Sequence, residues 1–472
     1  MTSPDTEPQS LYAKREPIFP RRVKGSFRTL KWWLMALTLG IYYITPWLRW
    51  DRGPNLPDQA VLVDLANRRF FFFMIEIWPH EFYFVAGLLI MAGLGLFLFT
   101  SAAGRVWCGY ACPQTVWTDL YILVERWVEG DRNARIRLHR QKWDGEKIRK
   151  RLVKWAIWFA IGLATGGAWI FYFTDAPSLA RDLVTGNAHP VAYTTMFILT
   201  ATTFAFGGFA REQICIYACP WPRIQAAMMD EDTLTIGYRD WRGEPRGKPG
   251  VAGHGDCIDC MACVNVCPMG IDIRNGQQMA CITCGLCIDA CDDMMDKIGK
   301  PRGLIGYLAL TDETRERAGQ APKSVWAHVF RPRTVLYTAL WAAVGIGLTV
   351  ALFLRSPIDV NVSPVRNPLF VTLKDGSIRN TYDLRLRNKS GKDEVYEIAL
   401  TAPGQFSIAL EGVEGNKVTV PANETFQQRL YVVAAPGTAA AQADRSDIRL
   451  WIARVGGTER VHHDTVFNGK GN

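Results

Sequence analysis

Five long apolar runs occur between residues 32 and 354, and polar segments separate them. Each run approaches or exceeds the roughly 20 residues that an α-helix needs to cross a bilayer. Tryptophan or tyrosine lies near several of the ends, as in the aromatic belts of membrane proteins. Core helices of soluble proteins rarely stay uncharged for so long, so the pattern predicts a helical transmembrane bundle of about five spans. The runs are residues 32–48, 82–103, 155–173, 190–210 and 335–354.

Lysine and arginine are distributed unevenly between the segments that join these runs. Residues 1–31 carry 7 of them, the 105–154 loop carries 12 and the 211–333 segment carries 15, whereas the 49–81 and 174–189 loops carry 4 and 1. Short loops rich in these residues stay in the cytoplasm. We therefore expect a multi-pass protein of a bacterial inner membrane, with the three basic segments in the cytoplasm and the C-terminal part in the periplasm.

A sixth, shorter apolar stretch lies at residues 70–78 and is interrupted by Glu76. We interpret it as interfacial, because it is too short to cross a bilayer as a helix. A span at this point would reverse the orientation of everything that follows.

After residue 356 the chain changes to a short-period alternation of apolar and polar residues. This alternation predicts strands that bury one face, and glycine, proline and asparagine mark the turns between them. Six or seven short strands over about 110 residues predict an antiparallel β-sandwich of immunoglobulin type. The predicted strands are residues 369–373, 380–387, 394–400, 417–420, 425–433 and 447–454, and the predicted turns are residues 375–376, 388–391, 403–404, 412–415 and 436–437.

The 12 cysteines fall into four tight groups between residues 108 and 291. Such grouping is typical of metal ligation in a reducing compartment rather than of disulfide bonds. The net charge of +9 does not indicate a nucleic-acid partner, because many of the basic residues flank the apolar runs. The sequence contains no Gly-rich dinucleotide fingerprint, no phosphate-binding loop and no serine-hydrolase motif.

Eight of the cysteines form two runs with the spacing Cys-x2-Cys-x2-Cys-x3-Cys. This is the spacing of bacterial two-cluster ferredoxins, in which the fourth cysteine of each run ligates the cluster of the other run. A structural zinc site fits this spacing poorly, so the sequence predicts two [4Fe–4S] clusters in a ferredoxin-like domain. The expected ligands are Cys257, Cys260, Cys263 and Cys291 for one cluster, and Cys281, Cys284, Cys287 and Cys267 for the other.

The remaining four cysteines belong to an internal repeat, the hexad Cys-x-Tyr-Ala-Cys-Pro, at residues 108–113 and 215–220. Cysteines four apart on a helix face the same way and suit a soft metal ion or a redox-active dithiol. Such a duplication implies a pseudo-symmetric helical core that brings the two hexads together. They then form an S4 site for Cu(I) or a dithiol that passes electrons to a metal ion; packing of small buried cysteines is the structural alternative. Met228 and Met229 are weaker candidates as additional thioether ligands.

These motifs resemble those of the FixG/RdxA/CcoG family of membrane ferredoxin-like proteins, over nearly the whole chain. Besides the double cysteine run, the resemblance rests on residues 107–114, 215–222 and 296–304 and on the predicted C-terminal sandwich. It implies a cupric reductase that serves the assembly of the cbb3-type cytochrome c oxidase. In that role Cys108, Cys112, Cys215 and Cys219 are the expected catalytic and copper-binding residues.

The resemblance implies a copper-exporting ATPase, copper chaperones and oxidase subunits as partners, besides membrane lipid and a cytoplasmic or membrane-bound electron donor. A homodimer is left open. Two other functions remain: a quinol- or flavin-linked electron carrier to another respiratory acceptor, and an oxidase assembly scaffold. The predicted organisation is a basic tail (1–31), a four-helix membrane core with both hexads (32–220), a cytoplasmic ferredoxin-like domain (221–333), a fifth transmembrane helix (334–355) and a periplasmic β-sandwich (356–472).

Overall fold

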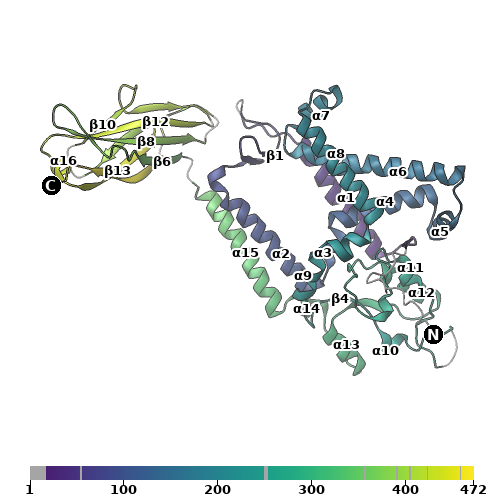
Figure 1. Ribbon diagram of the computed structural model, residues 1–472. Helices are drawn as coiled ribbons and strands as arrows, with labels where there is room; N and C mark the ends of the chain where they lie inside the picture. The colour runs from purple at the N-terminus through teal and green to yellow at the C-terminus, as the bar shows by residue number, and fades with distance from the viewer. Residues whose placement is uncertain are drawn as a thin grey trace, which may run out of the picture. The chain divides into compact units, whose positions relative to one another are not determined.

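The computed structural model describes residues 17–53, 56–248, 253–355, 358–389, 392–402, 406–422, 424–457 and 459–471. The chain separates into two compact units. The first comprises residues 1–48 and 59–348 and contains all 12 cysteines. The second comprises residues 49–58 and 349–472 and contains the β-sandwich. Figure 1 shows the elements of both units.

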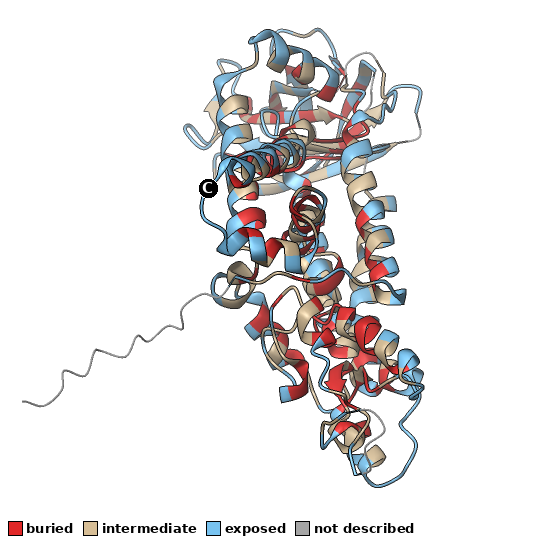
Figure 2. Cartoon of the chain, turned by 90° about the vertical axis from the view of Figure 1, so that its right-hand side faces the viewer, coloured by how far each residue is buried: buried red, intermediate tan, exposed pale blue. Residues whose placement is uncertain are grey.

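Four helical segments of the described chain are long and apolar enough to cross a membrane, by length and composition. They overlap the last four predicted runs, although the helix over the 155–173 run already begins at Gly145, and Figure 2 shows how much of the long helices is exposed. Because so much apolar side-chain surface faces outward, lipid rather than protein is the expected neighbour. The helices are α2 (Tyr83–Ala103), α6 (Gly145–Thr165, extended by a 3-10 turn at Gly167–Tyr172), α8 (Pro190–Ala205, extended by a π turn at Phe206–Ala210) and α15 (Pro332–Phe353).

These helices pack in pairs. Helices α2 and α15 run side by side, and the rings of Phe97 and Tyr337 lie 5.9 Å apart between them (Figure 1). Helices α6 and α8 pack through Trp158 and Phe204, whose rings meet edge to face at 6.5 Å. Aromatic pairs of this geometry stabilise a packed interface beyond their buried area.

The first predicted run forms a helix with different limits. Helix α1 (Ser26–Ile44) begins before the apolar run does, and a 3-10 turn at Thr45–Trp47 ends it where Pro46 occurs. The additional turns bring Arg28 and Lys31 into the helix, and α1 is not among the four helices that meet the membrane-spanning criterion. Arg28 and Lys31 are buried. Both pair with Asp119, at 3.2 and 2.9 Å, and this carboxylate compensates the cost of burying their charges.

Residues 70–78 are not helical. They form β2 (Arg69–Phe72) and β3 (Ile75–Ile77), which join β1 (Val61–Asp64) in a small antiparallel sheet. Phe71 fills the core of this sheet, and Glu76 pairs with Arg69 at 3.4 Å. The sheet excludes a sixth helical span at this point, and the interfacial location stays a prediction.

The cysteine runs lie in a small α/β segment of the first unit. Strand β4 (Thr235–Tyr238) pairs with β5 (Ile305–Leu308), and the short helices α11 (Ala262–Val266) and α12 (Leu286–Lys297) each contain cysteines of one run. Apolar side chains from these elements form two clusters around the cysteines. The other helices of the first unit are α3 (Val106–Tyr110), α4 (Pro113–Glu129), α5 (Arg132–Arg140), α7 (Ala176–Thr185), α9 (Trp221–Met228), α10 (Asp240–Gly243), α13 (Leu310–Arg317) and α14 (Val325–Val329).

The second unit is a sandwich of two antiparallel sheets with strand orders β10-β12-β8-β6, where β7 also pairs with β8, and β11-β9-β13-β14. Alternate residues of β8 point into the core, and the Tyr382 hydroxyl donates a hydrogen bond to the Val466 carbonyl of the other sheet at 2.7 Å. The strands are β6 (Ile358–Pro364), β7 (Val371–Thr372), β8 (Ile378–Asn388), β9 (Glu394–Thr401), β10 (Phe406–Leu410), β11 (Lys417–Val420), β12 (Thr425–Ala434), β13 (Arg445–Arg454) and β14 (Arg460–Asn468), with a short helix α16 (Ala439–Gln442).

Each of the six predicted strands has a counterpart in the sandwich, in β7, β8, β9, β11, β12 and β13. Strands β6, β10 and β14 were not predicted. The predicted turns at 375–376 and 436–437 are present, with Gly376 and Gly437 in the left-handed conformation. The predicted turn at 403–404 and part of the one at 388–391 lie outside the described residues.

Candidate metal centre

The first group of cysteines surrounds a small buried cavity. Cys257, Cys260 and Cys263 line it from the first run, and Cys291 reaches it from α12 of the second run. Tyr238 and Arg274 complete the polar part of the wall. Burial raises the pKa of Cys263 to about 11 and that of Cys291 to about 12. A metal bound here must therefore displace thiol protons.

The second group has the reciprocal arrangement. Cys281, Cys284 and Cys287 line a second cavity from the second run, and Cys267 reaches it from the first. Burial raises the pKa of Cys267 to about 12. The remaining lining is mostly isoleucine, leucine and methionine, and Cys263 also borders this cavity. The structure thus brings together the same two sets of four cysteines that the spacing assigned to two clusters.

Both cysteine loops share an unusual backbone pattern. Asp259 and Met261 have positive φ angles of 52° and 55°, and the equivalent positions of the second run, Thr283 and Gly285, have 55° and 74°. A residue other than glycine pays about 1–2 kcal/mol for this conformation. Alternating right- and left-handed residues point successive backbone N–H groups into a concavity that binds anions, as at many iron–sulfur sites. The Thr283 N–H donates to the Cys281 sulfur at 3.4 Å, as this geometry requires.

The donor chemistry fits [4Fe–4S] clusters. Each cavity has four soft sulfur donors and a largely apolar lining, and in the second cavity a backbone N–H is directed at sulfur. Over the part of the chain that the structure describes, no three cysteine, histidine or carboxylate side chains converge as they would around a single ion. Sulfur atoms spread around a cavity suit a multinuclear cluster better than one zinc ion.

The hexads have a different geometry from the one expected. Cys108 lies in α3, but α3 ends at Tyr110 and Cys112 adopts an extended conformation as the cap of α4. In the second hexad Cys215 lies in a π turn (Ile214–Ala218), and Cys219 is again extended. The prediction that each pair lies on one helix is therefore wrong. A proline follows Cys112 and Cys219, and a residue before proline avoids the helical conformation.

The two hexads nevertheless lie close together. Cys108 and Cys215 pack against the same apolar cluster, and burial together with the neighbouring thiols raises the pKa of Cys215 to about 12. The Cys108 sulfur lies 3.1 Å from Gln225 Oε1. Within the described residues the hexad sulfurs are not among any group that converges on a single ion. A mononuclear S4 site is therefore not preformed.

The first hexad directly contacts the second cysteine run. A Cβ atom on Gly109 would lie 2.6 Å from the Ile282 carbonyl oxygen and 3.0 Å from Cys284 Cα, so the two backbones meet at this glycine. Next to it, the Tyr110 hydroxyl donates a hydrogen bond to the Cys284 carbonyl at 3.0 Å. The equivalent Tyr217 of the second hexad is 62% exposed. The repeat is therefore symmetric in sequence but not in its contacts.

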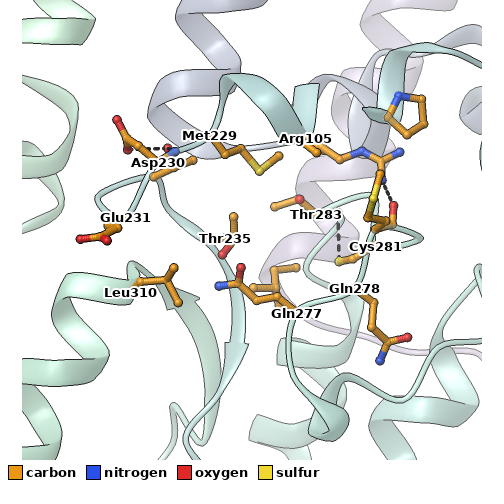
Figure 3. A pocket seen from close by; sticks show the side chains of 15 residues that line it. Arg105, Met229, Asp230, Glu231, Thr235, Gln277, Gln278, Cys281, Thr283 and Leu310 are labelled. Carbon is orange, nitrogen blue, oxygen red and sulfur yellow. Dashed lines mark hydrogen bonds between the residues drawn. The ribbon is translucent and has the colours of Figure 1, made fainter. Parts of the chain in front are cut away.

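Arg105 is a functional candidate that the sequence analysis missed. Its side chain is 4% exposed and donates to the Met279 carbonyl beside the second cysteine run (Figure 3). Burial raises the pKa values of Cys108 and Cys281, and the positive charge of Arg105 opposes the rise at both thiols. The sequence does contain a sign of this role, because an arginine comes shortly before each hexad. The arginine before the second hexad, Arg211, pairs with Glu125.

A cleft opens next to Arg105 and reaches Cys281. Figure 3 shows Met229, Glu231, Gln277 and Gln278 around it. Met229 lines the cleft, whereas Met228 is only 5% exposed and packs inside the protein. A small partner can approach Cys281 through this opening.

Buried ion pairs fix the surroundings of both cysteine systems. Asp289, between the last two cysteines, accepts hydrogen bonds from the N–H groups of Phe27 and Arg28 at 3.2 and 2.7 Å, so it caps α1. Glu125 of α4 pairs with Arg135 and with Arg211, the latter at 2.6 Å. Burial opposes the ionisation of Glu125, but these guanidinium groups outweigh it and lower its pKa to about 2.

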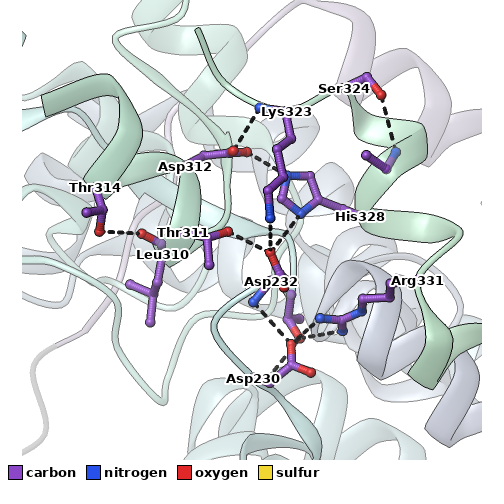
Figure 4. Close-up of polar contacts among 12 residues, drawn as sticks. Asp230, Asp232, Leu310, Thr311, Asp312, Thr314, Lys323, Ser324, His328 and Arg331 are labelled. Carbon is purple, nitrogen blue, oxygen red and sulfur yellow. Dashed lines mark hydrogen bonds and ion pairs between the residues drawn. The ribbon is translucent and has the colours of Figure 1, made fainter. Parts of the chain in front are cut away.

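A polar network anchors the cysteine segment to the start of α15. Figure 4 shows His328 between two carboxylates: its Nε2 lies 2.7 Å from Asp312 and its Nδ1 lies 3.6 Å from Asp232. Arg331 pairs with Asp230 in the same network. Burial raises the pKa of Asp230, but the hydrogen bonds from its arginine partners are stronger and hold it at about 2. This network holds the loop that borders the cleft.

Comparison with known proteins gives concordant matches along the chain. Residues 210–309 match a family described as a 4Fe-4S dicluster domain, residues 84–131 match a 4Fe-4S binding domain, and residues 348–470 match the IG-like fold at the C-terminus of FixG. Protein RdxB of Cereibacter sphaeroides is 76% identical over 477 residues, which cover 100% of both chains. Nitrogen fixation protein FixG of Rhizobium meliloti is 56% identical over 87% of this chain and 84% of its own length. Among solved structures, a FixG-related protein from Vibrio parahaemolyticus aligns with 25% of this chain and 99% of its own, at 18% identity and a TM-score of 0.22.

Proposed function

The chain belongs to the FixG/RdxA family of iron–sulfur electron-transfer proteins, and from this membership and the geometry of its cysteines we propose that it reduces Cu(II) to Cu(I). Cu(II) is the substrate and binds between the hexads, at Cys108, Cys112, Cys215 and Cys219. Each Cu(II) takes up one electron from a cytoplasmic or membrane-bound one-electron donor. The product, Cu(I), is the oxidation state that thiolate ligands favour.

In this proposal Cys257, Cys260, Cys263 and Cys291 hold one [4Fe–4S] cluster, and Cys267, Cys281, Cys284 and Cys287 hold the other. Such clusters accept and release single electrons when bound. The lining of the second cavity is apolar apart from its cysteines, and the N–H groups of the left-handed loops stabilise negative charge on sulfur in both sets.

The observation that carries the proposal is the contact between the first hexad and the second cysteine run. The Gly109 backbone lies against Ile282 and Cys284, and Tyr110 donates its hydrogen bond to Cys284. An electron on the second set of cysteines therefore needs to cross only one packed interface to reach the hexad cysteines. Arg105 favours the thiolate form of Cys108, which binds copper in this proposal, and that of Cys281, which binds a cluster.

The cellular setting is part of the proposal. The excess of lysine and arginine in the 105–154 and 211–333 segments supports a cytoplasmic location for both cysteine systems, with the sandwich in the periplasm. Cu(I) then leaves on the cytoplasmic side toward a copper-exporting ATPase and copper chaperones, and serves the assembly of a cbb3-type oxidase. Because the hexad sulfurs do not converge on one point, copper binding requires their side chains to reorient.

Serine substitutions at the hexad cysteines test this function. The full-length variant Cys108→Ser/Cys112→Ser/Cys215→Ser/Cys219→Ser should keep its iron content and the EPR signal of its reduced clusters. In the unsubstituted protein, added Cu(II) should abolish the reduced-cluster signal while Cu(I) appears; in the variant both changes should disappear. A variant with intact clusters that binds and reduces Cu(II) at the unsubstituted rate would refute the proposal.

A further inference from the structure

A positively charged cavity lies where α1 begins and faces α4. Arg22, Lys24 and Arg28 line one side of it, and Arg126 of α4 lines the other. Trp32 and Trp127 border the same cavity, and no carboxylate side chain lines it. The cavity lies apart from both cysteine cavities and from the cleft beside Cys281.

The protein neutralises the positive charge of this cavity only in part. Among the described residues, Arg22, Lys24 and Arg126 form no ion pair, and the Arg126 Nε is buried without a hydrogen-bond partner. Arg28 does pair with Asp119, but that carboxylate is shared with Lys31. Burial and the nearby Arg28 and Arg135 lower the pKa of Arg126 to about 10, and together they outweigh the opposing attraction of Asp119 and Asp131.

The backbone that carries these cations is held in place. The Arg21 N–H donates to the Asn265 carbonyl at 2.7 Å, and the Arg22 N–H donates to Asp131 at 3.1 Å. Arg126 donates to the Arg21 carbonyl at 3.2 Å. The side chains of Arg22 and Lys24 remain exposed, so the site has a fixed frame and charged groups free to bind.

The surroundings of the cavity match the surface of a membrane. Trp33, Leu37 and Ile41 form a stripe along α1 and are 73%, 59% and 59% exposed, which suits contact with acyl chains. The cavity lies at the polar end of that stripe. Trp127, 78% exposed, lies beside it, and tryptophan is enriched at the level of lipid head groups.

We propose that this cavity binds the phosphate of an anionic phospholipid. Guanidinium groups bind phosphate oxygens in pairs, and basic pockets between membrane helices on the cytoplasmic side bind anionic head groups. The apolar stripe of α1 accommodates the acyl chains of the same lipid, which a free phosphate ion or an acidic protein does not need. The bound lipid neutralises Arg126 and links α1 to α4.

Native mass spectrometry of the detergent-purified full-length protein tests this site. Phosphatidylglycerol should be retained at one molecule per chain, and phosphatidylcholine should be retained far less. Each cation contributes roughly a fivefold change in affinity at a membrane surface. Arg22→Gln/Lys24→Gln should therefore weaken phosphatidylglycerol binding roughly 25-fold, and adding Arg126→Gln should weaken it roughly 100-fold.

Arg137→Gln/Arg140→Gln is the matched control, because it removes two exposed cations of α5 that do not line the cavity. Equal weakening by this control would show that the attraction is generic and would overturn the proposal. Equal retention of phosphatidylcholine, or displacement of the lipid by millimolar inorganic phosphate, would also overturn it. Because Arg22 and Lys24 are exposed, their double variant tests the site even if Arg126→Gln misfolds.

Discussion

Gly109 provides the sharpest test of the contact between the two cysteine systems. In a Gly109→Ala variant the new Cβ atom would lie 2.6 Å from the Ile282 carbonyl oxygen and 3.0 and 3.1 Å from Cys284 Cα and N. These neighbours are backbone atoms and cannot rotate away. To reach a contact of 3.4 Å, the loop must retreat by about 0.8 Å from α3.

The energetic cost follows from the size of this clash. Overpacking of a well-packed interface costs about 1–3 kcal/mol. The advantage of alanine over glycine in helix propensity, at most about 1 kcal/mol, stabilises α3 whether or not the loop is docked, so it does not offset this cost. The fraction of molecules with the loop undocked therefore rises roughly 5- to 150-fold.

Hydrogen exchange of the full-length protein measures this change. Amides of residues 281–287 should exchange faster in Gly109→Ala by a factor within that range, because local opening sets their exchange rate. Gly109→Ile, which makes the first hexad identical in sequence to the second, should have a larger effect. Gly40→Ala is the control, since nothing lies within 4 Å of its new Cβ. Unchanged exchange in Gly109→Ala would refute the close approach and the electron route based on it.

Three further variants probe the supports of the site. Asp289→Ala removes the acceptor that caps α1 and should destabilise the docking of α1 by about 1–3 kcal/mol. Asp293 is an exposed neighbour on α12, so Asp293→Ala should have little effect. Hydrogen exchange of residues 27–31 compares the two variants. Tyr110→Phe leaves the Cys284 carbonyl without its hydrogen-bond donor and should shift the reduction potential of the clusters, measured by EPR titration. Tyr217 is exposed, so an equal shift in Tyr217→Phe would argue against the asymmetry of the hexads. The pKa of Glu125 falls from 4.5 to about 2 on folding. The ionised Glu125 side chain therefore contributes roughly 3 kcal/mol to the free energy of unfolding. This contribution is complete above about pH 4.5 and is lost as the pH falls toward 2. Glu125→Gln should destabilise the protein at neutral pH and flatten this acid transition in unfolding curves; a transition of unchanged steepness would assign it to other carboxylates.

The sequence predicted local features well where chemistry imposes a spacing. The spacing of the two cysteine runs predicted two sets of four cysteines, each with three from one run and the fourth from the other run. The structure gathers those same residues around two cavities. The assignment of clusters to these sets stays a prediction. The break at Cys112 was predictable in principle, because Pro113 disfavours helix at the preceding residue.

Long-range packing could not be predicted from periodicity. Gly109 and Ile282 are far apart in the sequence. The two hexads differ at one position, which is Gly109 in the first and Ile216 in the second, and only this difference hinted at a close contact of the first hexad. The start of α1 was placed too late because Lys31 looks like a solvent-exposed residue. The structure hides it against Asp119, a partner that a search for apolar runs does not reveal.

Weak alternation accounts for the failure to predict β14 but not for β6, whose residues do alternate apolar and polar. Strand β14 contains His462 and His463 within a largely polar stretch and lies at the edge of its sheet, where one partner strand suffices. Strand β8 lies between two partners and alternates buried and partly exposed residues along its length, so its pattern was clear.

The ion pairs of Arg28 and Lys31 with Asp119 have a consequence for how the protein is made. The two cations lie in the first turns of α1, and the ribosome adds Asp119 88 residues after Lys31. At roughly 5–20 residues per second, the nascent chain waits on the order of 10 s for the carboxylate that neutralises them. The ion pairs that dock α1 on α4 therefore form only after α4 has been synthesised, so this contact is made late although α1 is the first helix of the described chain.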